Sequence, residues 1–282
     1  MMWWALACTP DELPCTEEVG YRAPEVNVAA LEHANCYRLD MGLQPGSLDP
    51  VLDDATQAHA EYMLENGVLD HQEVADNPGF TGEWVWDRLE SAGYPLEPGS
   101  SWSEVLAEGD GARGSVDRWM NSVYHRVPFT MPGWRAVGFG QADPYVGMTF
   151  VMDYPAGFRA SVLYPSDGQT GVPTTFDSDT EWPDPVPDAR EVGPPITVTV
   201  SDVTIGDGSN PHGLSLVAAR VEGPEGALEV VTLQPEGDDY LQYAVAVIPR
   251  EPLQPMTDYD VEVTVMWGGQ EETVSGSFTT GP

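Results

Sequence analysis

The sequence predicts an α+β protein, in which a helical half with a few strands is followed by an all-β half. Two patterns predict this class. Residues 21–160 carry eight of the eleven arginines, most of the tryptophans and apolar residues at helical spacing. Residues 196–282 instead alternate apolar and polar residues, as in Thr197-Val198-Thr199-Val200. Helices that come first and strands that come last favour separate layers over a parallel α/β sheet.

Capping residues and apolar spacing mark four helices and two strands in the first half. Asp49 is the expected N-cap of the second helix, with Pro50 at its first position and Asn66-Gly67 at its end. Gly93 and Pro95 stop the third helix. The expected helices cover residues 24–39, 50–65, 84–91 and 113–124, and the expected strands cover 134–142 and 148–154.

Turn residues separate six expected strands in the last part of the chain and favour a β-sandwich. These strands cover residues 196–205, 214–221, 228–233, 240–248, 259–267 and 272–279. Residues 161–195 are rich in Pro and Asp, and such prolines favour an extended linker. The predicted domains are therefore 21–160 and 196–282, joined by this linker and preceded by residues 1–20 as a signal remnant or tether.

The chain is strongly acidic. It holds 46 acidic and 11 basic residues, every base an arginine, for a net charge of −35. This balance excludes nucleic acid and an anionic membrane as partners, because both need clustered cations. No apolar run reaches the ~18 residues that a membrane helix needs. Both halves are acidic, which is typical of a well-solvated surface, and we expect a monomer.

Three cysteines near the N-terminus each allow two interpretations. Ala5-Leu6-Ala7-Cys8 resembles the end of a bacterial lipoprotein signal, so Cys8 is a candidate for a lipid anchor. An incidental cysteine in a ragged N-terminus is the alternative. If Cys8 carries lipid, Cys15 and Cys36 remain for a disulfide, whose loop would contribute about 3 kcal/mol of stability. One buried and one exposed thiol is the alternative to that disulfide.

Two of the five histidines, His71 and His125, each follow an expected helix end, where a rigid scaffold can present a side chain to a cleft. His59 lies among apolar residues in the middle of the second helix, and we expect it to pack in the core. We interpret His33 as structural and His212 as a turn residue that faces solvent. The common nucleophile and phosphate-binding motifs are absent from the sequence.

Six motifs follow one another through residues 27–154 in the order of a known family. They are Glu32 to Leu43, Leu48 to Ala60, Gly67 to His71, Ser103 to Gly109, Trp119 to Arg126 and Val137 to Gly140. Their order resembles the CAP superfamily of cysteine-rich secretory proteins, antigen 5 and pathogenesis-related proteins, and its bacterial extracellular branch in particular. Residues Leu253 to Tyr259 and Gly276 to Thr280 resemble the closing strands of bacterial Ig-like and fibronectin-type domains.

The resemblance implies an α-β-α sandwich with a cleft, followed by an Ig-like β-sandwich. It also implies a cleft tetrad of two histidines and two glutamates, of which His71, Glu104 and His125 match. The place of the second glutamate holds Asn121-Ser122, so the set is at most a triad. Two imidazoles and a carboxylate suit zinc or another divalent cation, and the same set suits acid–base catalysis. A hydrogen-bonded structural network is the third interpretation.

Two main functions stay open. The first is an exported protein, extracellular or a cell-surface lipoprotein, that binds a small apolar ligand, a metal or a surface component, with the Ig-like domain as a spacer. The alternative is a hydrolase, either a peptidase or a cell-wall-directed enzyme, with His71, Glu104 and His125 as catalytic residues. Some family members bind lipid or sterol, and five tryptophans near the expected cleft fit that function, although we expect most of them in the core: Trp84, Trp86, Trp102, Trp119 and Trp134.

Overall fold

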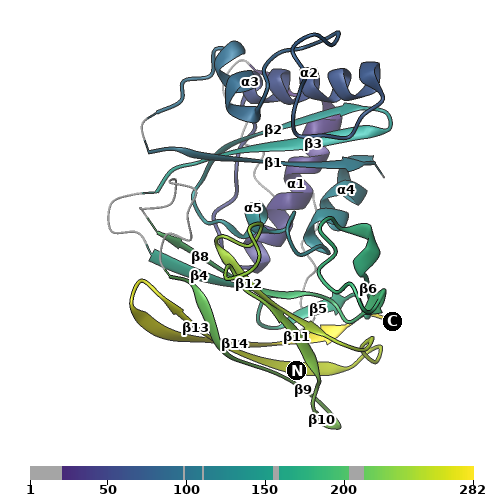
Figure 1. Ribbon diagram of the computed structural model, residues 1–282, viewed down its shortest axis with the longest axis vertical. Coiled ribbons are helices and arrows are strands. Elements are labelled where there is room, and N and C mark those ends of the chain that lie inside the picture. The colour runs from purple at the N-terminus through teal and green to yellow at the C-terminus, as the bar shows by residue number, and fades with distance from the viewer. Residues whose placement is uncertain (1–20, 98, 110, 155–158, 203–212) are drawn as a thin grey trace. The chain divides into compact units, whose positions relative to one another are not determined.

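The computed structural model describes residues 21–282 apart from 98, 110, 155–158 and 203–212 (Figure 1). These residues form two compact units. The α+β unit holds residues 21–119 and 133–154, and the β unit holds residues 120–132 and the described residues from 159 onward. No helix in this part of the chain is long and apolar enough to cross a membrane. The predicted lipid site at Cys8 and the disulfide partner Cys15 lie outside the described residues, whereas Cys36 is buried.

A three-stranded antiparallel sheet, of order β1-β3-β2, is the middle layer of the α+β unit. Helices α2 and α3 lie on one face of this sheet, and α1 and α4 lie on the other, which is the expected α-β-α order (Figure 1). The elements are α1 (Glu25–Asp40), α2 (Pro50–Asn66), α3 (Val85–Ser91), β1 (Ser101–Glu108), α4 (Gly111–Met120), β2 (Trp134–Ala142) and β3 (Tyr145–Met152).

The ends of α2 are set by the residues expected from the sequence. The Asp49 side chain accepts hydrogen bonds from the backbone N–H groups of Val51 at 2.8 Å and Leu52 at 3.3 Å. Gly67 follows the last turn with a φ of 63°, a left-handed conformation that glycine adopts without steric cost. The predicted N-cap and C-terminal glycine of this helix are therefore confirmed.

Helix α2 lies directly on β2 because two glycines leave room for its backbone. A Cβ at Gly138 would lie 2.3 Å from the backbone carbonyl carbon of Leu52, and a Cβ at Gly140 would lie 2.4 Å from that of Thr56. Thr56 also hydrogen-bonds through its hydroxyl to the hydroxyl of Thr149 on β3, at 2.9 Å. The sheet thereby fixes the position of the helix turn that follows Thr56.

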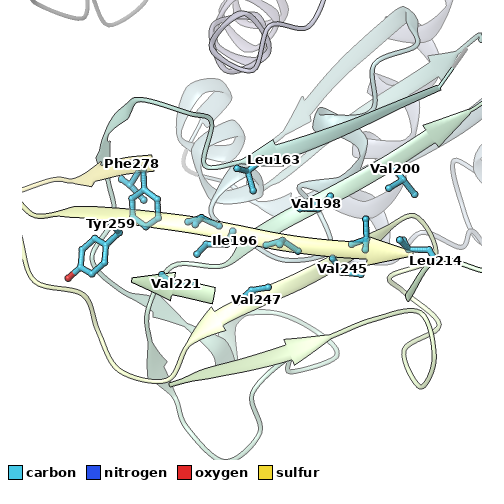
Figure 2. Packing of buried hydrophobic residues seen from close by; sticks show 14 of the residues in the cluster. Leu163, Ile196, Val198, Val200, Leu214, Val221, Val245, Val247, Tyr259 and Phe278 are labelled. Carbon is cyan, nitrogen blue, oxygen red and sulfur yellow. The ribbon is translucent and has the colours of Figure 1, made fainter. Parts of the chain in front are cut away.

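Two sheets share one apolar core in the β unit. Their strand orders are β10-β9-β13-β14-β5 and β11-β12-β8-β4. Val198 and Val245 from one sheet and Tyr259 and Phe278 from the other all belong to this core (Figure 2). The elements are α5 (Val127–Thr130), β4 (Arg159–Tyr164), β5 (Gln169–Val172), β6 (Phe176–Asp177), a 3₁₀ turn (Ser178–Thr180), β7 (Glu191–Val192), β8 (Ile196–Asp202), β9 (Ser215–Gly223), β10 (Gly226–Ala227), β11 (Val230–Leu233), β12 (Ala244–Pro249), β13 (Asp258–Trp267) and β14 (Gln270–Thr280).

Strand β12 is buried along its whole length, which explains its unbroken apolar sequence. Val245 and Val247 point into the core between the two sheets. Ala244, Ala246 and Ile248 pack on the opposite face, in a second apolar cluster that includes Val123, Phe176, Val186 and Val192. A strand with both faces covered does not show the polar–apolar alternation of a half-exposed strand.

Residues 161–195 were predicted to form an extended linker. They instead contribute strands to both sheets of the β unit. β4 pairs with β8 in the four-stranded sheet, and β5 pairs in parallel with β14 in the five-stranded sheet. Pro165 and Pro173 come directly after β4 and β5. A proline at that place ends a strand without removing a hydrogen bond from its pairing.

The fourth helix is shorter than predicted, because α4 ends at Met120 rather than near residue 124. The residues that follow belong to the β unit. The buried Arg126 donates hydrogen bonds to the carbonyl oxygens of Met120, at 2.6 Å, and Pro195, at 2.7 Å. The hydroxyls of Thr130 and Thr199 lie 2.7 Å apart and share a hydrogen bond. These contacts hold the segment after α4 against the start of β8.

We expect Gly140→Ala to lower the free energy of unfolding by about 1–3 kcal/mol, because its Cβ would force the α2 backbone away from β2. Gly147→Ala on β3 is the matched control, since its Cβ would lie 3.0 Å from a Leu106 methyl carbon, which can move aside. Urea unfolding of both variants measures the difference. Equal losses in the two variants would contradict the role of the close helix–sheet contact.

Candidate functional site

Four buried polar side chains meet between α2, α3, β1 and the loop that follows α2. We call them the charged cluster: His59 on α2, Glu73 in the loop, Arg88 on α3 and Glu104 on β1. His59 follows the turn of α2 that packs on the sheet, and Glu104 lies opposite Thr149 in the sheet. Buried ionised groups are stable only when they are paired and hydrogen-bonded.

Arg88 is the cation of the charged cluster. Its Nη2 donates to both carboxylate oxygens of Glu104, at 2.7 Å in the case of Oε2. Its Nη1 donates to the carbonyl oxygen of His71 at 2.9 Å, and its Nε lies 3.9 Å from Oε1 of Glu73. One guanidinium therefore links α3 to β1 and to the loop after α2.

The carboxylate of Glu73 is held from several sides. His59 Nδ1 lies 2.7 Å from Oε1, and the backbone N–H groups of Thr81 and Gly82 donate to Oε2 at 2.6 and 3.3 Å. Burial by itself raises the pKa of Glu73. The hydrogen bonds from His59 and Thr81 and the charges of His59 and Arg88 outweigh burial and leave that pKa below its usual value.

Glu104 is similarly held in its charged form. Burial raises its pKa, but the hydrogen bond to His71 and the charge of Arg88 lower it further than burial raises it. The Nε2 atom of His59 lies 3.7 Å from Oε2 of Glu104 and 3.1 Å from the carbonyl oxygen of Asp70. His59 thus stands between the two glutamates of the charged cluster.

His71 lies at the solvent edge of the charged cluster. Its side chain is 50% exposed, against 4% for Glu104, and its Nδ1 lies 3.5 Å from Oε2 of Glu104. The structure therefore brings together two of the three predicted site residues. The third, His125, belongs to the β unit and is described with its own neighbours.

His125 contacts Glu181, a residue from the segment that was predicted to be a linker. Its Nδ1 lies 3.1 Å from Oε1 of Glu181. The same carboxylate accepts from the backbone N–H groups of Val123 and Tyr124, both at 2.7 Å. Tyr124 donates its hydroxyl hydrogen to Asp238 at 2.9 Å, and burial together with this hydrogen bond raises the pKa of Tyr124.

Sequence analysis missed three members of the charged cluster. His59 was interpreted as a core residue, and it is buried and stacks on Tyr62, but its ring also contacts charged groups. Glu73 follows His71 by two residues, and Arg88 is the one base of α3. The available signal was an arginine directly beside Leu89 in a short helix, because an arginine on the buried side of a helix requires carboxylate partners.

The donor set does not suit a divalent cation without rearrangement. No group of three or more His, Cys, Asp or Glu side chains among the described residues has the geometry to hold a metal ion. Both oxygens of Glu104 already accept from Arg88, whose positive charge would face any bound cation. The residues present therefore resemble an ion-pair network more than a metal centre.

We expect Glu104→Gln to lower the free energy of unfolding by about 3–5 kcal/mol, because it leaves the buried charge of Arg88 without its main partner. His71→Ala is the matched control, and we expect it to cost about 1 kcal/mol or less, because an exposed side chain contributes little through its ion pair. Urea unfolding at neutral pH measures both. If Glu104→Gln lowered the free energy of unfolding less than His71→Ala does, the ion pair between Arg88 and Glu104 would not be the main contact of the charged cluster.

The lowered pKa values of Glu73 and Glu104 also predict an acid-sensitive fold. A carboxyl group with a lower pKa in the folded than in the unfolded state stabilises the fold above its unfolded pKa of about 4.3, and this contribution disappears as the pH falls through the folded pKa. The difference in unfolding free energy between the unmodified protein and Glu73→Gln should therefore shrink from pH 7 to pH 3. A difference in unfolding free energy that stays constant from pH 7 to pH 3 would contradict a lowered pKa of Glu73 in the folded protein.

Comparison with known proteins places the α+β unit in a family. Residues 31–154 match the family model described as CAP: Cysteine-rich secretory protein family. No curated protein matches the chain significantly.

The chain is also similar to three solved structures, each at low identity. An extracellular protein containing an SCP domain from Bacillus anthracis is 19% identical, over 45% of this chain and 40% of that chain, with a TM-score of 0.40. An outer surface protein from Borrelia burgdorferi is 17% identical, over 44% and 89%, with a TM-score of 0.35. A cysteine-rich secretory protein from Staphylococcus aureus is 17% identical, over 49% and 42%, with a TM-score of 0.34. The family match, the motif order and the α-β-α layers agree, and residues 31–154 of the chain carry a CAP domain of the cysteine-rich secretory protein family.

Proposed function

We propose that the CAP domain is a binding module for a small apolar ligand, and that it binds through a row of exposed tryptophans. The observation that carries this proposal is the contact between Trp84, Trp86 and Trp102. The ring centroids of Trp84 and Trp86 lie 5.7 Å apart with nearly parallel planes, and those of Trp86 and Trp102 lie 6.3 Å apart. All three rings are exposed to solvent, whereas Trp119 is buried.

Three neighbouring tryptophans that each keep between 36% and 40% of their surface in water are a poor arrangement for stability alone. Each large apolar ring left in solvent forgoes the free energy that burial would supply, about 25 cal/mol per Å². Exposed apolar patches of this kind are typical of binding surfaces. A ligand that covers the row would recover that free energy, and flat apolar surfaces suit a flat or extended apolar molecule best.

The tryptophan row is built on the same elements as the charged cluster. Trp86 precedes Arg88 by two residues, and Trp102 precedes Glu104 by two residues on β1, so Trp102 and Glu104 point to the same face of the sheet. The ion pair between Arg88 and Glu104 thus holds α3 and β1 in the register that places Trp86 beside Trp102. We infer that the charged cluster supports the binding surface and does not itself carry out chemistry.

Acid–base hydrolysis has less support. A general base or acid that works near neutral pH needs a pKa close to that pH, which for a glutamate means a raised pKa. The pKa values of Glu73 and Glu104 are lowered, and their oxygens are already bound. The hydrolase function and a zinc site at His71, Glu104 and His125 stay predictions.

For the β unit we infer an Ig-like module that acts as a spacer on an exported protein. The backbone N–H of Gln254 donates to the hydroxyl of Tyr259 at 2.9 Å, and Tyr259 stacks on Phe278. A tyrosine that bonds to the backbone a few residues upstream is a recurrent corner of such sandwiches. Both residues lie in the segments that resemble Ig-like closing strands.

We expect the 282-residue protein to bind the neutral fluorescent probe N-phenyl-1-naphthylamine, and Trp86→Ala to weaken this binding about tenfold. The probe carries no charge, so the acidic surface does not repel it. Met256→Ala, which removes an exposed apolar side chain of the β unit, is the control and should leave the affinity unchanged. Fluorescence titration measures all three proteins. Equal affinities for the unmodified protein and Trp86→Ala would overturn the proposal.

A further inference from the structure

A second group of aromatic side chains lies on the β unit and takes no part in the proposed binding of apolar ligands. We call it the aromatic cluster: Tyr124, Trp182 and Tyr240. The ring centroids of Tyr124 and Tyr240 lie 5.8 Å apart with planes at 58°, and those of Trp182 and Tyr240 lie 5.6 Å apart at 78°. Trp182 is 77% exposed and Tyr240 is 52% exposed, so solvent reaches two of the three residues.

Three carboxylates lie close enough to Tyr124 of the aromatic cluster to interact with it electrostatically: Asp238, Glu181 and Asp184. Asp238 accepts the hydroxyl hydrogen of Tyr124 through one oxygen and the backbone N–H of Tyr240 through the other. Glu181 directly precedes Trp182, and Asp184 follows it by two residues. Asp184 accepts from the backbone N–H of Val186 at 2.9 Å and from a serine hydroxyl.

The negative charge of these carboxylates is not neutralised by arginine. Glu181 has backbone N–H groups and the ring of His125 as its partners. Among the residues that the structure describes, none of the ion pairs of Asp184, Asp238 or Glu181 involves an arginine; the described ion pairs of Arg190 and Arg250 go to other acids. The surface around the rings therefore attracts cations, and the net charge of −35 adds to this attraction.

We propose that the aromatic cluster binds a small organic cation of the quaternary ammonium type. Ring faces attract cations through their quadrupoles, and quaternary ammonium groups are recognised by several aromatic rings set at angles to one another. The inclined planes of the aromatic cluster suit a compact, rounded cation better than a flat ring. A weakly hydrated cation also loses little on leaving water, whereas a metal ion would need several converging carboxylates, which the described residues do not supply.

A neighbouring cavity offers room for the rest of such a ligand. It has a volume of about 260 Å³, and it is lined by two leucines and by polar residues that include Gln234, Glu236 and Asp238. Asp238 thus belongs both to this cavity and to the surroundings of the aromatic cluster. A ligand with a quaternary ammonium head and a short hydroxylated tail, such as choline, has the matching chemistry.

The test compares choline with 3,3-dimethylbutan-1-ol, in which carbon replaces the charged nitrogen and the shape is kept. Calorimetric titration of the 282-residue protein with each compound measures the role of the charge. We expect choline to bind saturably, the neutral alcohol to bind at least tenfold more weakly, and added NaCl to weaken choline binding. Equal binding of the two compounds, or no binding of choline, would overturn the proposal.

Variants of Trp182 separate an interaction with the ring face from simple apolar contact. We expect Trp182→Leu to weaken choline binding about tenfold and Trp182→Phe to retain most of it, because only phenylalanine keeps an aromatic face. The exposure of Trp182 makes both variants compatible with folding, which urea unfolding checks. Val217→Ala, at an exposed apolar residue on β9, is the control and should bind choline as the unmodified protein does. Equal affinities of the leucine and phenylalanine variants would contradict the proposal.

Discussion

The α+β unit depends most on the buried contacts that the guanidinium of Arg88 makes. It reaches Glu104 on β1, the carbonyl of His71 and the neighbourhood of Glu73, so three segments distant in sequence share one buried cation. Removing such an ion from water costs several kcal/mol, and only its close hydrogen bonds offset that cost. A buried pair of this kind contributes geometry more than stability, because it permits one arrangement of α3 on β1. The exposed tryptophans of those two elements take their positions from it.

The parts of the fold that depend on neighbours in sequence were predictable. Asp49, Pro50 and Gly67 mark the ends of α2 by local hydrogen bonding and backbone preference, and both ends are where these residues predict them. Strands β8 and β13 likewise follow from alternation of side chains. Strand β1 carries no such alternation and was missed, because its neighbours in the sheet, not its own sequence, make it a strand.

The partners of charged residues were not predictable, because they are chosen by tertiary structure. A buried histidine on a helix looks the same in sequence whether it meets a leucine or a glutamate, and His59 was therefore assigned to the core. Glu181 and His125 are separated by 56 residues, and prolines between them indicated a linker. The family motifs pointed to His71 and Glu104, whose side chains lie 3.5 Å apart, but not to the arginine that pairs with the carboxylate.

The chain passes between the two units more than once, and this limits how the two units could have been joined during evolution. Along the described residues the chain leaves the α+β unit after Trp119, returns at Gly133 and leaves again after Tyr154. The range matched by the family therefore donates a segment to the β unit, and β4 and β5 lie before the strands that sequence alone assigns to it. A gene rearrangement that joined the two parts at a single crossover would leave both incomplete. The two units are more readily inherited together than exchanged as separate modules.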